Sequence, residues 1–334
     1  MERKKNPPRI WNIAKFFLAI VLISIVVSKT NFYQLQLLRE NIVLGWLIAH
    51  FLSFVVMTIV KAGQYHLLIG NVTKYKNVLR VVIWQNTISN FIANSAGIAS
   101  YMTMLKAEQN VKLTRSGVTF LITKFGDLLA ICLYLGLSAG LVWSQIQPLR
   151  WITILLIVVM LFGLLTFLIT ILWRERFVSL VTKILFGIKL GHFSLVSRGL
   201  EILHSLAQEE QASIFAMLRT GLLMSLFYMT VTMASAYTGV RMFNVQIGIW
   251  TVIYVAALMQ LVSFVPIQVL GGLGITEVTA VYFYSFFGLN QGEMSAVMLG
   301  LRAIFYLMNV AMLLYLPVSA FLEKITTPSL NSQP

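Results

Sequence analysis

Cysteine, aspartate and histidine are scarce in this chain of 334 residues, which contains one cysteine, one aspartate and four histidines. Because Cys132 is alone, the sequence excludes an intrachain disulfide and a cysteine-based metal site. The histidines stand at positions 50, 66, 192 and 204, and their spacing is not that of metal ligands. We therefore predict a protein that uses no metal ion and no cofactor.

Charged side chains are also few, at 11% of the residues, whereas a soluble domain carries about 25%. Hydrophobic residues account for 58% of the chain and form long runs. Runs of this length are typical of helices that cross a bilayer. We predict an all-α, polytopic integral membrane protein. The runs cover residues 11–28, 42–69, 81–101, 117–143, 150–173, 214–240, 247–288 and 294–320.

The runs are predicted to form a single membrane domain, 1–334. It begins with an N-terminal anchor helix, 1–28, because no small-residue cleavage site follows this first run. A first half, 42–173, and a second half, 214–322, follow. Between the halves, residues 174–213 alternate apolar and charged positions at near-helical spacing, which predicts a cytoplasmic amphipathic insert on the membrane surface.

The formal net charge of +14 is concentrated between the runs. We attribute this charge to the excess of Lys and Arg in cytoplasmic loops, where these residues are attracted to anionic lipid head groups. We predict no nucleic acid partner. If 81–101 enters and leaves the membrane on one side, seventeen basic residues lie inside and four outside. If it crosses fully, eight of them lie on the wrong side. The count favours re-entry and places both termini in the cytoplasm.

Two of the runs have features of broken helices. Residues 81–101 contain Asn86, Asn90 and Gly97 and are too polar to face lipid, although a polar helix packed inside a bundle is the alternative. Residues 247–288 are interrupted by the sequence PIQVLGGLG, which indicates either a re-entrant hairpin or two tight spans. We therefore predict about six full spans plus two broken or re-entrant segments.

The two broken segments resemble each other. Gly-Ile-Ala-Ser at 97–100 aligns with Gly-Ile-Thr-Glu at 274–277, and in the spans that follow Lys124 falls one position past Arg302. Three full crossings separate the two units, so the second is expected to be inverted. Inverted repeats with broken helices are typical of transporters. We predict such a repeat.

Asp127, the only aspartate, lies inside a predicted span with Lys124 three residues before it on the same helix face. A charge at the bilayer centre costs at least about 2.5–3.5 kcal/mol, so it pairs with another charge or faces water. One interpretation is a Lys124–Asp127 pair that only neutralises itself. The other is a polar cavity that also contains Glu277 and Arg302, near the place where the broken segments meet.

The second break contains Pro266, Gly271, Gly272 and Gly274 ahead of Glu277. Proline cannot donate a backbone hydrogen bond, and glycine reaches backbone conformations that other residues avoid. A half-helix that begins after Gly274 would direct free N–H groups at an anion such as a lipid phosphate. The simpler explanation of Glu277 is that a carboxylate suits the first turn of a helix.

This arrangement resembles the transmembrane region of lysylphosphatidylglycerol synthases, which also occurs as a stand-alone membrane protein. The second half of that family reads proline, Gly-Gly-x-Gly, glutamate and a later arginine in the last span. The matching residues here are Pro266, Gly271, Gly272, Gly274, Glu277 and Arg302.

The first half of the chain fits the family less well. Asn90, Gly97 and Asp127 correspond to an asparagine, a glycine and the later acid of the family pattern. The proline, glutamate and arginine of that pattern are missing, and Asn94 or a neighbour, Ile98 and Tyr101 occupy their places. These departures concern the ligand more than the fold.

In bifunctional members, the resemblance implies a membrane domain that flips an aminoacylated phospholipid, followed by a soluble aminoacyl-transfer domain. Only a short polar tail follows residue 322 here. We predict a non-enzymatic protein of the bacterial plasma membrane that translocates or binds an anionic phospholipid or lipid-linked substrate. The predicted substrate-binding residues are Asn90, Gly97, Lys124, Asp127, Pro266, Gly271, Gly272, Gly274, Glu277 and Arg302.

Two alternative functions remain open. The chain could be an integral-membrane lipid transferase in which Asp127 or Glu277 acts as the base. It could also be an accessory subunit whose partner is a separate lipid-modifying enzyme, anchored through residues 173–213. An activity assay of the isolated chain separates these functions from transport.

Overall fold

A computed structural model describes most of the chain, and its regular structure is helical throughout the described ranges. The predicted anchor 1–28 lies outside these ranges, as do Pro266 and Gly271. The described residues are 42–70, 72–109, 111, 113–187, 196, 197, 200, 204, 211–263, 272–317 and 319.

Five of the described helices are long and apolar enough to cross a membrane. These spans cover Leu44–Ile69, Arg115–Leu141, Gln147–Trp173, Ser213–Arg241 and Gln291–Pro317. They coincide with five of the six full spans predicted from hydropathy, and the sixth falls in the anchor region. The prediction of an all-α, polytopic membrane protein is confirmed. The helices are α3 (Leu44–Ile69), α4 (Tyr75–Phe91), α5 (Asn94–Gln109), α6 (Leu113–Leu141), η1 (Gln147–Leu149), α7 (Arg150–Gly187), α9 (Gln211–Arg241), α10 (Ile249–Ser263), α11 (Ile275–Ser285) and α12 (Gln291–Leu313).

The polar run 81–101 is divided between two helices, α4 and α5, that fold back on each other. α4 has 17 residues and α5 has 16, so each is about 25 Å long at 1.5 Å per residue, less than the roughly 30 Å hydrocarbon core. Side chains at the start of α4 and the end of α5 meet, because Asn77 Nδ2 donates to Gln109 Oε1 over 2.9 Å. The pair is therefore an antiparallel hairpin whose two ends lie together, as re-entry requires.

The second predicted break also separates two short helices. α10 has 15 residues and α11 has 11, and the two helices are in contact. Gly272 and Gly274, which precede α11, have φ angles of 78° and 86°, a region that residues with a side chain rarely adopt. These glycines therefore permit the left-handed backbone from which α11 begins.

The predicted insert 174–213 differs from the structure at its start. α7 continues without interruption for 38 residues, from Arg150 to Gly187, so the first part of the insert extends the preceding span and does not form a separate helix. The sequence RERFVSLVTK, 174–183, keeps an apolar residue every three or four positions and has no glycine or proline that would end the helix. α9 begins at Gln211.

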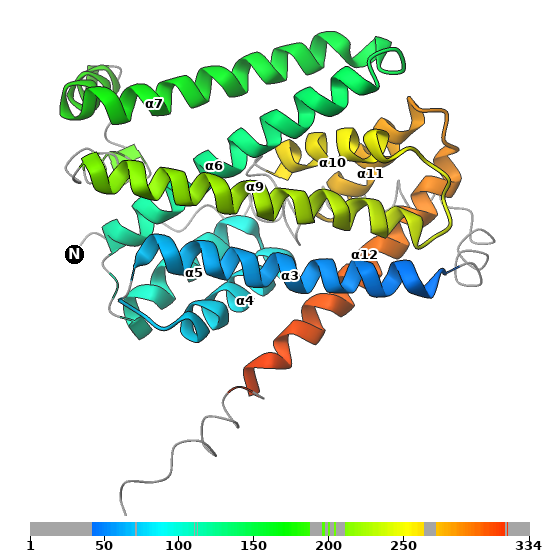
Figure 1. The fold of residues 1–334 in the computed structure, drawn as a ribbon, viewed down its shortest axis with the longest axis horizontal. Helices are drawn as coiled ribbons and strands as arrows, with labels where there is room; N and C mark the ends of the chain where they lie inside the picture. Colours follow the sequence, from blue (N-terminus) through cyan, green and yellow to red (C-terminus); the bar gives the residue numbers. More distant parts are fainter. Residues whose placement is uncertain are drawn as a thin grey trace, which may run out of the picture.

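Figure 1 shows α3 and α9 lying side by side along the long axis of the molecule, with α7 at its edge, where it packs mainly on α6. The other main contacts fall into matching sets. α4 packs on α5 and α12, and α10 packs on α11 and α6. α6 contacts α9 and α5, and α12 contacts α3 and α11. If α3, α4, α5 and α6 are exchanged in order with α9, α10, α11 and α12, the same pairs of helices are in contact.

Candidate functional site

Glu277 lies in the first turn of α11 and is held by the backbone that precedes it. The Gly274 N–H donates to Glu277 Oε2 over 2.6 Å. The Thr276 hydroxyl lies 3.0 Å from Glu277 Oε1 and 3.0 Å from the carbonyl oxygen of Gly272. A carboxylate near the positive end of a helix is favoured by the helix dipole. The predicted half-helix after Gly274 is thus present, and its own glutamate occupies the first turn.

Arg302, from α12, completes this site. Its Nε donates to Glu277 Oε1 over 2.5 Å, and its Nη2 donates to the Thr276 hydroxyl. The guanidinium carbon also lies 5.8 Å from the ring centroid of Phe305 and 5.6 Å from that of Tyr306, distances at which a cation is attracted to an aromatic ring. The sequence left open whether Glu277 and Arg302 touch, and the structure joins them.

The Glu277–Arg302 pair is almost fully removed from solvent. The side chain of Arg302 is 11% exposed and that of Glu277 is 5% exposed. Removing one member of such a pair strands a buried charge, so a pair that opens must give Arg302 another partner. An anion that enters this site can therefore compete with Glu277 for Arg302.

Asp127 belongs to a second ion pair, on other helices. Its Oδ2 lies 2.8 Å from Nζ of Lys61 in α3, and its Oδ1 lies 3.0 Å from the same nitrogen. The side chain of Asp127 is 6% exposed and that of Lys61 is 12% exposed. The partner predicted from spacing is Lys124, whose ammonium lies 5.6 Å from the ring centroid of Phe120. The observed pair joins α3 to α6, a tertiary contact that spacing within one helix does not reveal.

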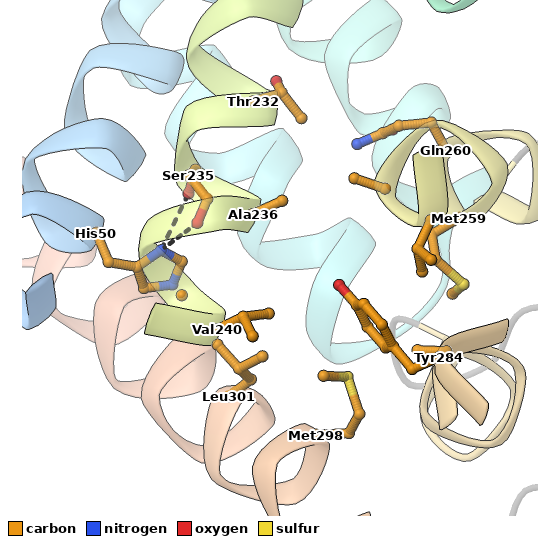
Figure 2. Close-up of a pocket in the computed structure, with 14 residues that line it drawn as sticks. His50, Thr232, Ser235, Ala236, Val240, Met259, Gln260, Tyr284, Met298 and Leu301 are labelled. Atoms are coloured by element: carbon orange, nitrogen blue, oxygen red, sulfur yellow. Dashed lines mark hydrogen bonds between the residues drawn. The ribbon is translucent and has the colours of Figure 1, made fainter. Parts of the chain in front are cut away.

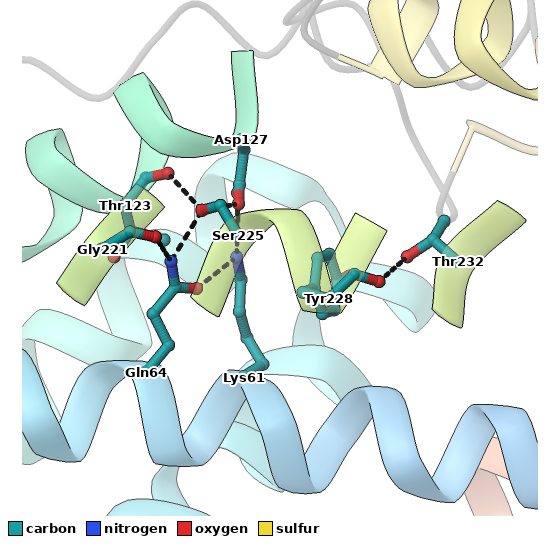
Figure 3. A network of polar contacts seen from close by, with 8 residues as sticks. All are labelled: Lys61, Gln64, Thr123, Asp127, Gly221, Ser225, Tyr228 and Thr232. Carbon is teal, nitrogen blue, oxygen red and sulfur yellow. Dashed lines mark hydrogen bonds and ion pairs between the residues drawn. The ribbon is translucent and has the colours of Figure 1, made fainter. Parts of the chain in front are cut away.

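A network of hydrogen bonds surrounds the Lys61–Asp127 pair (Figure 3). Ser225 of α9 donates to Asp127 Oδ1 over 2.8 Å. Gln64 accepts from Lys61 Nζ over 3.0 Å and donates to Ser225 Oγ over 2.7 Å. The Lys61 ammonium also lies 4.2 Å from the ring centroid of Tyr228. The network connects α3, α6 and α9, so it cross-links the first half of the chain to the second.

The remaining predicted residues of the first half make packing contacts. Asn90 Nδ2 donates to Asn309 Oδ1 over 2.8 Å and thereby joins α4 to α12. Gly97 lies where α5 meets α4: a Cβ atom placed there would be 2.7 Å from the carbonyl oxygen of Gln85 and even closer to Ser89 Oγ. Only glycine permits this approach without a shift of the hairpin.

Lys61, Gln64 and Ser225 are the main site residues that sequence reasoning did not single out. Lys61 is the only charged residue in the run 42–69, and a lone charge in a span requires a partner. That signal was sufficient to nominate Lys61 but not to choose its partner. Gln64 and Ser225 carry no such signal, because uncharged polar residues are common in membrane helices.

Comparison with known protein families places the chain in one of them. The family model for the lysylphosphatidylglycerol synthase TM region matches residues 12–312. No curated protein and no solved structure matches the chain. Because the match covers most of the sequence, the chain belongs to the lysylphosphatidylglycerol synthase transmembrane-region family.

Proposed function

We propose that this member of the lysylphosphatidylglycerol synthase transmembrane-region family moves a lipid with an anionic head group across the membrane. Arg302 is the residue that binds the phosphate. The observation that carries the proposal is the buried Glu277–Arg302 pair at the start of α11. Arginine binds phosphate through two parallel hydrogen bonds, as it does a carboxylate.

Glu277 acts in this proposal as an internal substitute for the phosphate. In the observed state its carboxylate accepts from the Gly274 N–H and from Arg302. Backbone N–H groups at a helix start and an arginine are donors that also suit a phosphate. When a lipid phosphate arrives, Arg302 exchanges its carboxylate partner for the phosphate, Glu277 takes up a proton so that no unpaired carboxylate stays buried beside it, and α11 is released from α12. The pair thus serves as a gate that the substrate itself opens.

The helix contacts support a transporter architecture. The matching contact sets of α3–α6 and α9–α12 are those expected of two related units, and we propose that they form the inverted repeat predicted from the sequence. Each unit contains a pair of short helices, α4–α5 or α10–α11. Transporters with inverted repeats place their substrate site at broken helices of this kind.

The charge count supports a cytoplasmic position for the α5–α6 connector and for residues 174–213. With the hairpin α4–α5 re-entrant, both ends of α10–α11 lie on the outer side. The transferase alternative is less favoured for Asp127, because a general base needs a free carboxylate and that of Asp127 is engaged by Lys61 and Ser225.

The test is lipid transport by the purified chain in phosphatidylcholine vesicles. The vesicles contain a trace of a phospholipid with one negative charge and a fluorescent NBD head group, and added dithionite destroys the fluorescence of the outer leaflet only. We expect vesicles with the protein to lose more fluorescence than the outer leaflet contributes, and vesicles without protein to lose only the outer-leaflet share. Equal losses from both kinds of vesicle would contradict the proposed function.

A further inference from the structure

A cavity of about 200 Å³ lies between α3, α9, α10, α11 and α12 (Figure 2). Its wall is mostly apolar, and Val240, Met259, Met298 and Leu301 contribute to it. A mostly apolar wall of this kind accepts apolar ligands. Methionine side chains adapt to ligands of irregular shape. The cavity therefore suits hydrocarbon better than a charged head group.

Five polar side chains interrupt this apolar wall: His50, Thr232, Ser235, Gln260 and Tyr284. Thr232 donates to the carbonyl oxygen of Tyr228. The Nδ1 atom of His50 is engaged, because it lies 2.9 Å from the Ser235 carbonyl oxygen and 3.1 Å from Ser235 Oγ. Tyr284 and Gln260 differ from His50: Figure 2 shows the Tyr284 hydroxyl and the Gln260 amide directed into the cavity. Among the described residues, neither side chain has a hydrogen-bond partner. Tyr284 is only 4% exposed.

Two donors without a partner face the same mostly apolar space, so this pattern points to a ligand that supplies an acceptor. The ligand must combine hydrocarbon with a hydrogen-bond acceptor that carries no charge. The ester group at the head of a fatty acyl chain has this combination. Its carbonyl oxygen accepts from a hydroxyl or an amide, and the chain that follows it is apolar.

The cavity lies next to the Glu277–Arg302 pair along two helices. Tyr284 follows Glu277 by two turns of α11, a rise of roughly 10 Å, and Leu301 directly precedes Arg302 in α12. A phospholipid carries its phosphate and its ester groups on one glycerol unit, so one molecule can contact both places. On the proposed topology the cavity lies on the outer side of the pair. A lipid held with its phosphate at Arg302 and its chain outward has the orientation of the cytoplasmic leaflet.

We propose that the cavity between α3, α9, α10, α11 and α12 binds the ester end of an acyl chain of the transported lipid. This inference rests on the proposed function and narrows it, because a polyprenyl phosphate carries no ester carbonyl. The Tyr284 hydroxyl donates to the carbonyl oxygen, and the Gln260 amide is the second donor. Arg302 binds the phosphate of the same molecule.

The experiment compares two NBD head-labelled anionic lipids in the vesicle assay above, one with ester-linked chains and one with ether-linked chains. The two lipids share the head group, the phosphate and the chain length. A neutral hydrogen bond is worth about five- to tenfold in rate or affinity, so we expect the diester lipid to move about that much faster. Tyr284→Phe should lower the ratio by slowing the diester lipid, and the Gln260 amide should account for the preference that remains.

Matched controls lie on the same helices. Tyr282, two residues from Tyr284 in α11, is 54% exposed, so Tyr282→Phe should leave the ratio unchanged. Ala236 lines the cavity whereas Ala234 of the same helix is exposed. Ala236→Phe should therefore slow both lipids and Ala234→Phe neither. If Tyr284→Phe does not insert, Gln260→Leu is the second variant, and it too should narrow the ratio.

The outcomes separate this inference from the proposed function. If the wild-type chain moves both lipids at one rate while Arg302→Ala stops transport, the ester site is wrong and the phosphate site stands. The ester site is also wrong if a polyprenyl phosphate slows transport of the labelled diester lipid as strongly as an unlabelled diester lipid does. If the wild-type chain moves neither lipid, the proposed function is wrong and the inference falls with it.

Discussion

Replacing Asp127 by asparagine tests whether the Lys61–Asp127 pair holds the two halves of the chain together. The variant leaves the Lys61 ammonium without its counter-ion, although the contacts with Gln64 and the Tyr228 ring remain. Breaking one side of a buried ion pair costs about 3–5 kcal/mol. We expect a loss near the lower end of that range, because the introduced amide oxygen would still accept from Ser225.

A double variant distinguishes lost pairing from lost packing. Lys61→Met combined with Asp127→Leu removes both charges, and such replacements are often neutral or stabilising by about 1–4 kcal/mol. Here Ser225 loses an acceptor and Gln64 loses a donor, which costs about 1 kcal/mol each. The double variant should therefore lie within about 2 kcal/mol of the wild type and above Asp127→Asn.

The assay is the free energy of unfolding in mixed micelles, measured by far-UV circular dichroism for the wild type and each variant. Lys124→Met is the matched control for Lys61→Met. If Lys124→Met rescues Asp127→Leu as well as Lys61→Met does, the assignment of the ion pair to Lys61 is refuted. Transport is then measured on the double variant. Retained transport assigns the pair to the scaffold, and a stable but inactive protein assigns it to the substrate pathway.

Three further predictions follow from single positions. In a Cys132→Ser background, cysteines introduced at the exposed positions 107 and 179 should react with an impermeant maleimide only after the cells are permeabilised. A cysteine at the exposed position 144 should react in intact cells. Labelling of position 107 from outside would contradict re-entry of α4–α5. In the same unfolding assay, Gly97→Val should destabilise the protein by more than about 2 kcal/mol, because the valine side chain would overlap Ser89 and Gln85. Gly136→Ala is the control, because a Cβ atom at position 136 meets no atom within 4 Å. This variant should stabilise the protein by about 0.5–1 kcal/mol. Gly272→Val should insert but lose transport, because valine at a φ of 78° is strained by about 1–3 kcal/mol; normal transport by this variant would contradict the role assigned to the turn.

The spans and the two breaks were predictable from the sequence because both depend on local composition. A full crossing needs about 20 apolar residues, and the chain supplies them at 42–69 and 214–240. The α4–α5 hairpin was predictable from the number of basic residues on either side of it. The extension of α7 to Gly187 was not predictable. A continued membrane helix and a separate surface helix show the same helical periodicity, so the sequence pattern does not distinguish them.

The partners of the charged residues were only partly predictable. Arg302 and Glu277 are charged residues of predicted membrane segments, which require partners, so their proximity was a reasonable hypothesis before the structure joined them. Asp127 has a lysine three residues away in its own helix, yet its carboxylate reaches Lys61 of α3. The cavity at Tyr284 was not predictable, because a cavity is a property of several packed helices and leaves no pattern in one of them.

Transport by an Arg302 variant tests the central claim most directly. Arg302→Ala and the control Arg219→Ala, which replaces an exposed arginine of α9, are reconstituted at equal density and assayed with the NBD-labelled anionic lipid. We expect Arg219→Ala to transport as the wild type does and Arg302→Ala to lose transport while remaining inserted. Arg302→Lys should retain part of the rate if a point charge suffices, and none if two parallel hydrogen bonds are required. Wild-type transport by a correctly inserted Arg302→Ala protein would contradict the phosphate site and leave Glu277 and Arg302 as a packing contact between α11 and α12.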